Sequence, residues 1–129
     1  MKILIIEDDP SIAKLYQVEL ASRGYKVEIA TDGESGIAKA KEWIPDLVLI
    51  DIMMPKINGI DTLKAIKADP NLKNVIAMML TNFGQDNLVK EAFAGGASDY
   101  VLKYQSTPAE VAEKVGQHLF PKEAKQPAS

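Results

Sequence analysis

The residue of this sequence best placed to do chemistry is an aspartate at the end of a buried strand. Asp51 follows the mostly apolar run 46–50, which is bounded by turn residues and is typical of a strand buried on both faces. A second apolar run, 3–6, also ends in acidic residues, Glu7, Asp8 and Asp9. Open α/β sheets carry their chemistry at the carboxyl ends of central strands. Two such strands ending in carboxylates predict a metal or phosphoryl site.

A hydroxyl and an ammonium follow two further strands. Thr81 follows the run 75–80, and Lys103 follows the run 98–102. An all-oxygen acidic cluster suits Mg²⁺, which takes few carboxylates and keeps several waters. With a phosphoryl group on Asp51, Mg²⁺ and Lys103 would offset its charge and Thr81 would donate a hydrogen bond. Taken singly, Thr81 and Lys103 are ordinary strand residues, and only their shared position at strand ends favours this function.

Strands and helices alternate five times along the chain, which indicates a parallel sheet with helices on both faces. The predicted strands are 2–6, 26–30, 46–50, 75–80 and 98–102. The predicted helices are 10–23, 34–43, 59–68, 85–94 and 108–119. The first, third and fourth strands are continuous apolar runs and should be central, whereas the second and fifth should lie at the edges. We therefore expect a flavodoxin-like, doubly wound, five-stranded α/β sheet with strand order 2-1-3-4-5 and five helices.

Capping residues support these helix limits. Asp9 precedes Pro10 and is expected to be the N-cap of the first helix rather than a metal ligand. Gly24 and Gly96 are expected to end helices in left-handed conformations. Thr107 lies three residues before a glutamate, the spacing of a capping box.

The composition excludes several classes of protein. The 129 residues include no cysteine, which rules out disulfides and thiolate sites and suits a reducing compartment. A net charge of −3 gives no basic footprint for nucleic acid, and no apolar run is long enough for a signal peptide or a membrane span. We expect a cytoplasmic protein with one domain over residues 1–120 and a disordered, apolar-poor tail over 121–129.

Three segments taken together resemble a known family. Residues 5–9 are similar to an acidic turn, 51–59 to a phosphoacceptor segment and 96–103 to a last strand, all of the receiver domain of two-component response regulators. The resemblance covers about residues 1–120, and the chain is similar to the chemotaxis-regulator type. Within the phosphoacceptor segment the chain has Asn58, where aspartate is also common.

The resemblance implies a phosphorylation-dependent signalling switch rather than a turnover enzyme. Asp51 would accept a phosphoryl group from a histidine kinase or a histidine phosphotransfer protein. Asp8, Asp51 and the backbone carbonyl of Met53 would ligate Mg²⁺, and Glu7 would act through a bound water. Lys103 would pair with the carboxylate and then with the phosphoryl group.

The resemblance also implies how the signal would leave the site. Thr81 would move toward the phosphoryl group, and Tyr100 would turn inward as it does so. The added charge, about −1.5 to −2, would change a partner-binding face formed by the predicted elements 85–94, 98–102 and 108–119. The output partner would be a protein of unknown identity, with no nucleic acid or membrane bound by this chain.

The chain departs from the family pattern in two places, after Lys103 and after Thr81. Tyr104 follows Lys103 where the family usually has proline, often with a cis peptide. Since a cis bond before a residue other than proline costs about 2.5–4 kcal/mol, we predict a trans bond. Asn82 and Phe83 follow Thr81 where a small residue is common. We predict that they crowd the mouth of the site and slow both small phosphodonors and the attack of water on the acyl phosphate.

Other functions fit the residues less well. A flavodoxin-like cofactor binder needs a phosphate cradle after the first strand, where this chain has acidic residues. A haloacid-dehalogenase-like phosphatase needs an acid two residues after its nucleophile, where this chain has Met53. A degenerate receiver that binds partners without phosphorylation is the alternative left open. His118, the only histidine, is expected to be a solvent-exposed helix residue.

Overall fold

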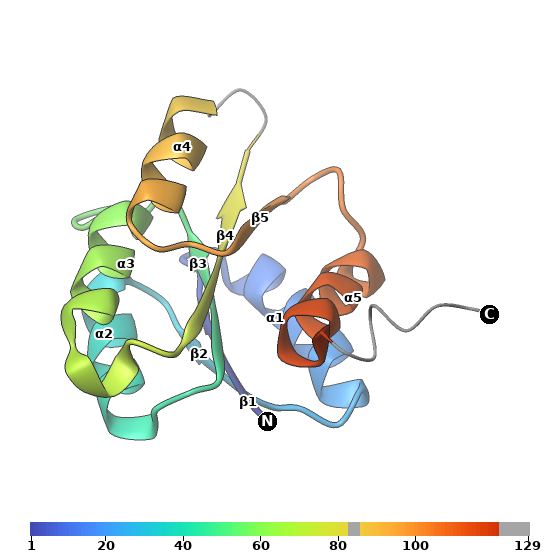
Figure 1. Cartoon of the computed structure of the whole chain (residues 1–129). Coiled ribbons are helices and arrows are strands. Elements are labelled where there is room, and N and C mark those ends of the chain that lie inside the picture. The colour runs from blue at the N-terminus through green and yellow to red at the C-terminus, as the bar shows by residue number, and fades with distance from the viewer. Residues whose placement is uncertain (83–85, 122–129) are drawn as a thin grey trace.

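The computed structural model describes residues 1–82 and 86–121, which form five strands and five α-helices (Figure 1). The strands are β1 (Lys2–Ile6), β2 (Lys26–Ala30), β3 (Leu47–Asp51), β4 (Ile76–Thr81) and β5 (Asp99–Leu102). The helices are α1 (Pro10–Ser22), α2 (Gly33–Trp43), α3 (Gly59–Ala68), α4 (Asp86–Ala94) and α5 (Pro108–Leu119). The predicted order of elements is confirmed. The tail over 122–129, expected to be disordered, lies outside the described residues.

All five strands are parallel and lie in the order β2-β1-β3-β4-β5. This is the predicted strand order and the flavodoxin-like fold. Every residue of β3 is buried, as expected for a central strand, whereas β2 and β5 include exposed positions. In register, Ile6 of β1 lies beside Ile50 of β3, so the residues that follow them emerge at one edge.

Helices cover both faces of the sheet. Figure 1 shows α1 and α5 on one side and α2, α3 and α4 on the other. Alternate residues of β1 point to the two sides: Ile3 and Ile5 pack with α1 and α5, and Leu4 and Ile6 pack in the opposite core. Burial of these aliphatic side chains supplies most of the driving force for folding.

The predicted caps are present. Asp9 is the N-cap of α1, and its Oδ1 accepts a hydrogen bond from the Ser11 backbone N–H at 2.9 Å. Thr107 and Glu110 form the capping box of α5 with hydrogen bonds of 2.9 and 3.1 Å. Gly24 has φ +93° and adopts the left-handed conformation that ends α1.

A short 3₁₀ helix, Pro70–Leu72, was not predicted. The Asp69 side chain accepts a hydrogen bond from the Asn71 backbone N–H at 2.9 Å and starts this turn, with proline at the next position. None of the helices in the described parts of the chain combines the length and apolar character that a bilayer crossing requires.

Candidate functional site

Three carboxylates converge where β1 and β3 end. Asp51 is the last residue of β3 and is 2% exposed, and Glu7 directly follows β1 and is fully buried. Asp8, next in the chain, is exposed. One carboxylate oxygen from each of the three lies within 4.8 Å of the others. The structure therefore brings together the acids that the sequence predicted, and leaves Asp9 to cap α1.

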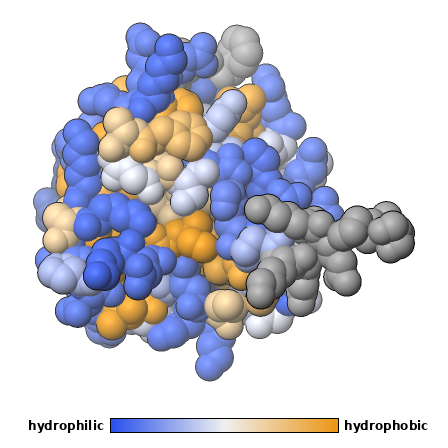
Figure 2. Space-filling view, viewed as in Figure 1, coloured by the Kyte–Doolittle hydropathy of each residue, from blue (hydrophilic) through white to orange (hydrophobic). Residues whose placement is uncertain are grey.

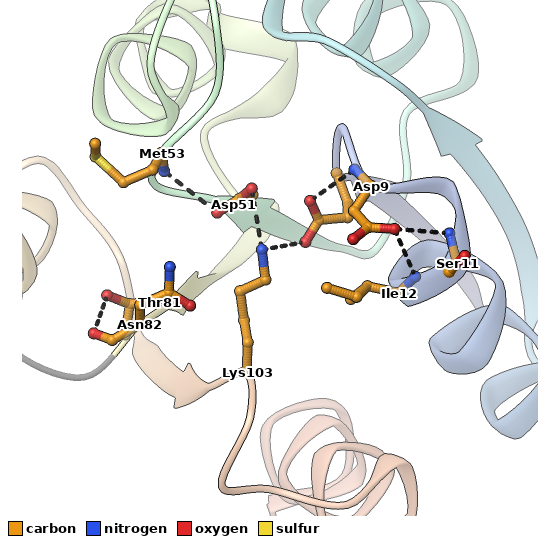
Figure 3. Close-up of polar contacts among 9 residues, drawn as sticks. Asp9, Ser11, Ile12, Asp51, Met53, Thr81, Asn82 and Lys103 are labelled. Carbon is orange, nitrogen blue, oxygen red and sulfur yellow. Dashed lines mark hydrogen bonds and ion pairs between the residues drawn. The ribbon is translucent and has the colours of Figure 1, made fainter.

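Lys103 reaches the same site from the end of β5 (Figure 3). Its Nζ lies 3.2 Å from Asp51 Oδ2 and 2.8 Å from Glu7 Oε1. The Lys103 side chain is only 6% exposed, so both ion pairs are shielded from water. The backbone N–H of Lys103 donates to the Thr81 carbonyl at 2.9 Å, which fixes where the side chain leaves the sheet.

The loop after β3 holds the second oxygen of Asp51. The Met53 backbone N–H donates to Asp51 Oδ1 at 3.2 Å. The Gly59 backbone N–H donates to the Ile52 carbonyl at 2.8 Å and closes the loop onto the start of α3. A Cβ at Gly59 would collide with the carbonyl of Asp51, so only glycine allows this close approach.

The site carries more negative charge than Lys103 offsets. Burial, hydrogen bonding to Glu7 and the charge of Glu7 raise the pKa of Asp51 to about 8, against the opposing effect of Lys103. Burial alone would raise the pKa of Asp8 too, but hydrogen bonds to Glu7 and Asp51 lower it overall. For Lys103, burial is outweighed by Glu7 and Asp51, which raise its pKa. Lys103 therefore stays charged.

The donor set fits a hard divalent cation. Three carboxylates face one ammonium, so a formal excess of two negative charges stays at the edge when all are ionised. The oxygens come from a rigid strand end and its neighbouring turn, and Asp8 keeps the group open to solvent. Mg²⁺ prefers such a site, with few protein carboxylates and several retained waters.

Thr81 and Tyr100 lie on the neighbouring strands. Thr81, the last residue of β4, is 1% exposed, and its hydroxyl donates to the Asn82 carbonyl at 3.2 Å (Figure 3). Tyr100 in β5 lies on the surface and is 37% exposed. The structure thus places Thr81 at the same sheet edge as Asp51, and Tyr100 on the outer face of the edge strand.

Comparison with known sequences identifies the family. Residues 3–115 match the response regulator receiver domain. The chain belongs to this family.

Individual relatives agree. The chemotaxis protein CheY of Thermotoga maritima is 38% identical over 104 residues, which cover 79% of this chain and 84% of that protein. The DNA-binding dual master transcriptional regulator RpaA of Synechocystis is 38% identical over 102 residues, or 79% of this chain and 42% of the relative. A receiver domain protein of Methanospirillum hungatei superposes with a TM-score of 0.84 at 30% identity, covering 96% of this chain and 97% of that one. The chain spans less than half of the length of RpaA and of the similar transcriptional regulators that it matches.

The residue after Lys103 leaves the geometry of this receiver intact. The Lys103–Tyr104 peptide bond is trans, as predicted. Lys103 nevertheless reaches both Glu7 and Asp51, so proline is not needed to aim the ammonium. Tyr104 is 74% exposed and adds an aromatic ring to the surface beside the site.

Of the two residues predicted to crowd the mouth of the site, Asn82 lies within the described residues. Asn82 is exposed and accepts the hydrogen bond from Thr81 through its backbone carbonyl. Phe83 lies outside the described residues. Slow entry of small phosphodonors stays a prediction, tested by comparing Asn82→Ala with the parent for acetyl phosphate labelling and for loss of the label.

Two polar contacts were missed by sequence reasoning. Glu7 was expected to act on a metal through water, but its Oε1 also forms an ion pair with Lys103. His118 was expected to be solvent-exposed, and this was wrong: it is half-buried and its Nε2 lies 2.9 Å from Asp99 Oδ2. Lys114 and His118 are four residues apart, so they share a helix face toward β5. That spacing could have indicated an acidic partner on the strand.

Proposed function

We propose that Asp51 accepts a phosphoryl group from the phosphohistidine of a histidine kinase or a histidine phosphotransfer protein, in a Mg²⁺-dependent reaction in the cytoplasm. The observation that supports this most is the buried carboxylate of Asp51, paired with Lys103 and flanked by Glu7 and Asp8. A structural ion pair would not need two further acids at its side.

The reaction is a transfer between a nitrogen and an oxygen. An oxygen of ionised Asp51 forms a bond to phosphorus while the bond from phosphorus to the donor imidazole breaks, and the imidazole keeps the electron pair. Asp8, Asp51 and the Met53 carbonyl would hold Mg²⁺, with Glu7 acting through water, and the bound ion would offset charge on the phosphoryl oxygens. Lys103 supplies a further fixed positive charge from within 3.2 Å of Asp51.

The switch follows from the new charge at this edge. A phosphoryl group adds about −1.5 to −2 charges and several strong acceptors. The Thr81 hydroxyl, which donates to the Asn82 carbonyl without the phosphoryl group, would donate to a phosphoryl oxygen instead. Tyr100 would then turn inward, and the face formed by α4, β5 and α5 would bind an output protein differently.

In this proposal the phosphodonor docks on a groove beside the acidic edge. A shallow groove runs along α1 to the start of α5 and is lined by Pro10, Ser11, Lys14, Leu15, Val18, Glu19 and Pro108. Leu15 and Val18 are 58% and 57% exposed, although both are aliphatic. Pro10 and Ser11 of this groove directly follow Asp8 and Asp9 in the chain, so the groove begins beside the acidic edge. A donor helix with an apolar stripe would cover the two aliphatic side chains.

In this proposal the chain is a switch, not a turnover enzyme, since it is itself the acceptor. Its net charge of −3 and the groove on α1 favour protein partners over nucleic acid. Proteins that bind the phosphorylated chain can be captured with it, which would identify the kinase and the output protein.

Labelling tests the proposal. The chain should take up radiolabel from a phosphohistidine donor or acetyl phosphate only with Mg²⁺, and Asp51→Asn should abolish it. Asp61→Asn, an exposed helix position on α3, is the matched control and should label normally. If the parent chain binds its partners equally well with and without label, the phosphorylation-independent alternative replaces this account.

A further inference from the structure

Two helices, α4 and α5, hold the ring of Tyr100 on the outer face of β5. From α4, the Phe93 ring meets it edge to face, with centroids 6.2 Å apart and planes at 90°. From α5, Lys114 Nζ lies 5.7 Å from the ring centroid. Both geometries are attractive, one between aromatic quadrupoles and one between a cation and a π face.

Lys114 is itself held in place by β5. Its Nζ donates to the Tyr100 carbonyl at 3.2 Å and lies 3.5 Å from Asp99 Oδ1. Asp99 is fixed in turn, because Oδ1 accepts from the Tyr100 backbone N–H at 2.8 Å and Oδ2 lies 2.9 Å from His118 Nε2. These contacts favour the position of the ammonium beside the ring, although the Lys114 side chain is 45% exposed.

We infer that Phe93 and Lys114 form a latch that keeps Tyr100 outward in the unphosphorylated chain, and that they are positioning residues for the switch. Figure 2 shows that apolar surface interrupts a mostly hydrophilic exterior on the side where β5 faces the viewer in Figure 1. Phe93 is 44% exposed, so its ring is not part of the buried core.

The latch determines how far phosphorylation must shift the equilibrium between the outward and inward positions of the Tyr100 ring. An exposed cation–π contact and an edge-to-face pair together favour the outward ring by roughly tenfold. Removing them raises the inward population before any phosphoryl group is present. This consequence rests on the switch role of Tyr100 proposed above, whereas the release of the ring does not.

The test measures exposure of the Tyr100 ring. Chains carrying 3-fluorotyrosine give one ¹⁹F signal per tyrosine, and Tyr100→Phe assigns the signal of interest. The solvent isotope shift between H₂O and D₂O reports ring exposure. For Phe93→Ala and Lys114→Met combined, we expect this shift to fall by about half. If the ring stayed in place, removing Phe93 would expose more of it, so an unchanged or larger shift overturns the inference.

Controls separate a latch from a loss of structure. Lys114→Arg, made alone in the parent chain, keeps the cation and should leave the isotope shift of Tyr100 at the parental value. Phe120→Ala and Lys64→Met remove a similar exposed ring and an exposed lysine elsewhere and should leave the signal unchanged. The latch variant should also label several times faster with acetyl phosphate. If the ring is released but Asp51 never labels, the proposed function fails and the latch stands.

Discussion

Lys103 Nζ lies closer to Glu7 Oε1, at 2.8 Å, than to Asp51 Oδ2, at 3.2 Å. The buried ammonium is therefore shared, and the proposed phosphoacceptor has the longer contact. Both acids are almost fully buried, so the two ion pairs are only weakly screened by water. Glu7 thus sets the electrostatic state of Asp51 as well as lying beside the proposed metal site.

Glu7→Gln should lower the pKa of Asp51. Burial is the largest cause of the raised pKa, and hydrogen bonding and charge from Glu7 are the next two. The substitution removes that charge and leaves Lys103 to pair with Asp51 alone. A ¹³C titration of the Asp51 carboxyl in metal-free protein should give a midpoint clearly below the parental value of about 8.

An exposed glutamate provides the control for this titration. Glu34→Gln on α2 removes the same charge from the chain at a distance and should leave the Asp51 midpoint where it is. A midpoint that stays put or rises in Glu7→Gln would show that Glu7 does not control Asp51.

Asp51→Asn should stabilise the metal-free protein, more so at higher pH. The pKa of Asp51 rises from 3.8 to about 8 on folding, so between these values the folded state holds a proton that the unfolded state has released. Stability contributed by this group is therefore lost as pH rises through the window. With a chelator, the melting temperature of the variant relative to the parent should increase by a few degrees from about pH 5 to about pH 8.

Mg²⁺ should reverse the difference in melting temperature between Asp51→Asn and the parent. A cation that binds only the folded parent raises its melting temperature by mass action, and the variant has lost one ligand. Equal melting curves for parent and variant at every pH, with and without Mg²⁺, would contradict both the raised pKa and the metal site.

Gly59→Ala should destabilise the chain by about 1–3 kcal/mol, because the new methyl group meets backbone that cannot move easily. The nearest atoms to it belong to the main chain of Asp51 and Ile52. Gly116→Ala is the control, since its Cβ would meet nothing closer than 3.7 Å and alanine is the better helix former. Urea unfolding measures both, and equal stability of the two variants would refute the close approach.

Leu15→Ala with Val18→Ala should slow transfer from a phosphohistidine protein but not from acetyl phosphate. Only the protein donor needs the groove on α1, and truncating buried anchors of an interface typically costs more than about 1 kcal/mol, or roughly tenfold in kcat/KM. Lys41→Ala, an exposed position on α2, should leave both rates unchanged. An equal loss with both donors would place the defect at Asp51 rather than in docking.

The fold could be predicted because local and global signals agree. Continuous apolar runs marked β1, β3 and β4 as central, and alternation marked β2 as an edge, which together gave the strand order. The carboxyl ends of neighbouring parallel strands then had to bring Glu7, Asp8 and Asp51 together. The 3₁₀ turn at Pro70–Leu72 was missed because it is started by one hydrogen bond, which the Asp69 side chain accepts from the Asn71 backbone N–H.

The finer contacts of the site could not be read from spacing. Whether Lys103 pairs with one acid or two depends on side-chain reach, which sequence distance does not measure. The half-buried pair of Asp99 and His118 likewise depends on how α5 lies against β5. Both are long-range contacts between groups whose residue types are ordinary on exposed surfaces.

The most direct test of the account is Mg²⁺-dependent formation of an acyl phosphate on Asp51. Mass spectrometry of the chain after reaction with a phosphohistidine donor, followed by borohydride reduction and peptide mapping, locates the modified carboxyl. The account predicts homoserine at position 51 with Mg²⁺ present and none after chelation. A phosphoryl group on another residue, or none under any condition, would contradict it.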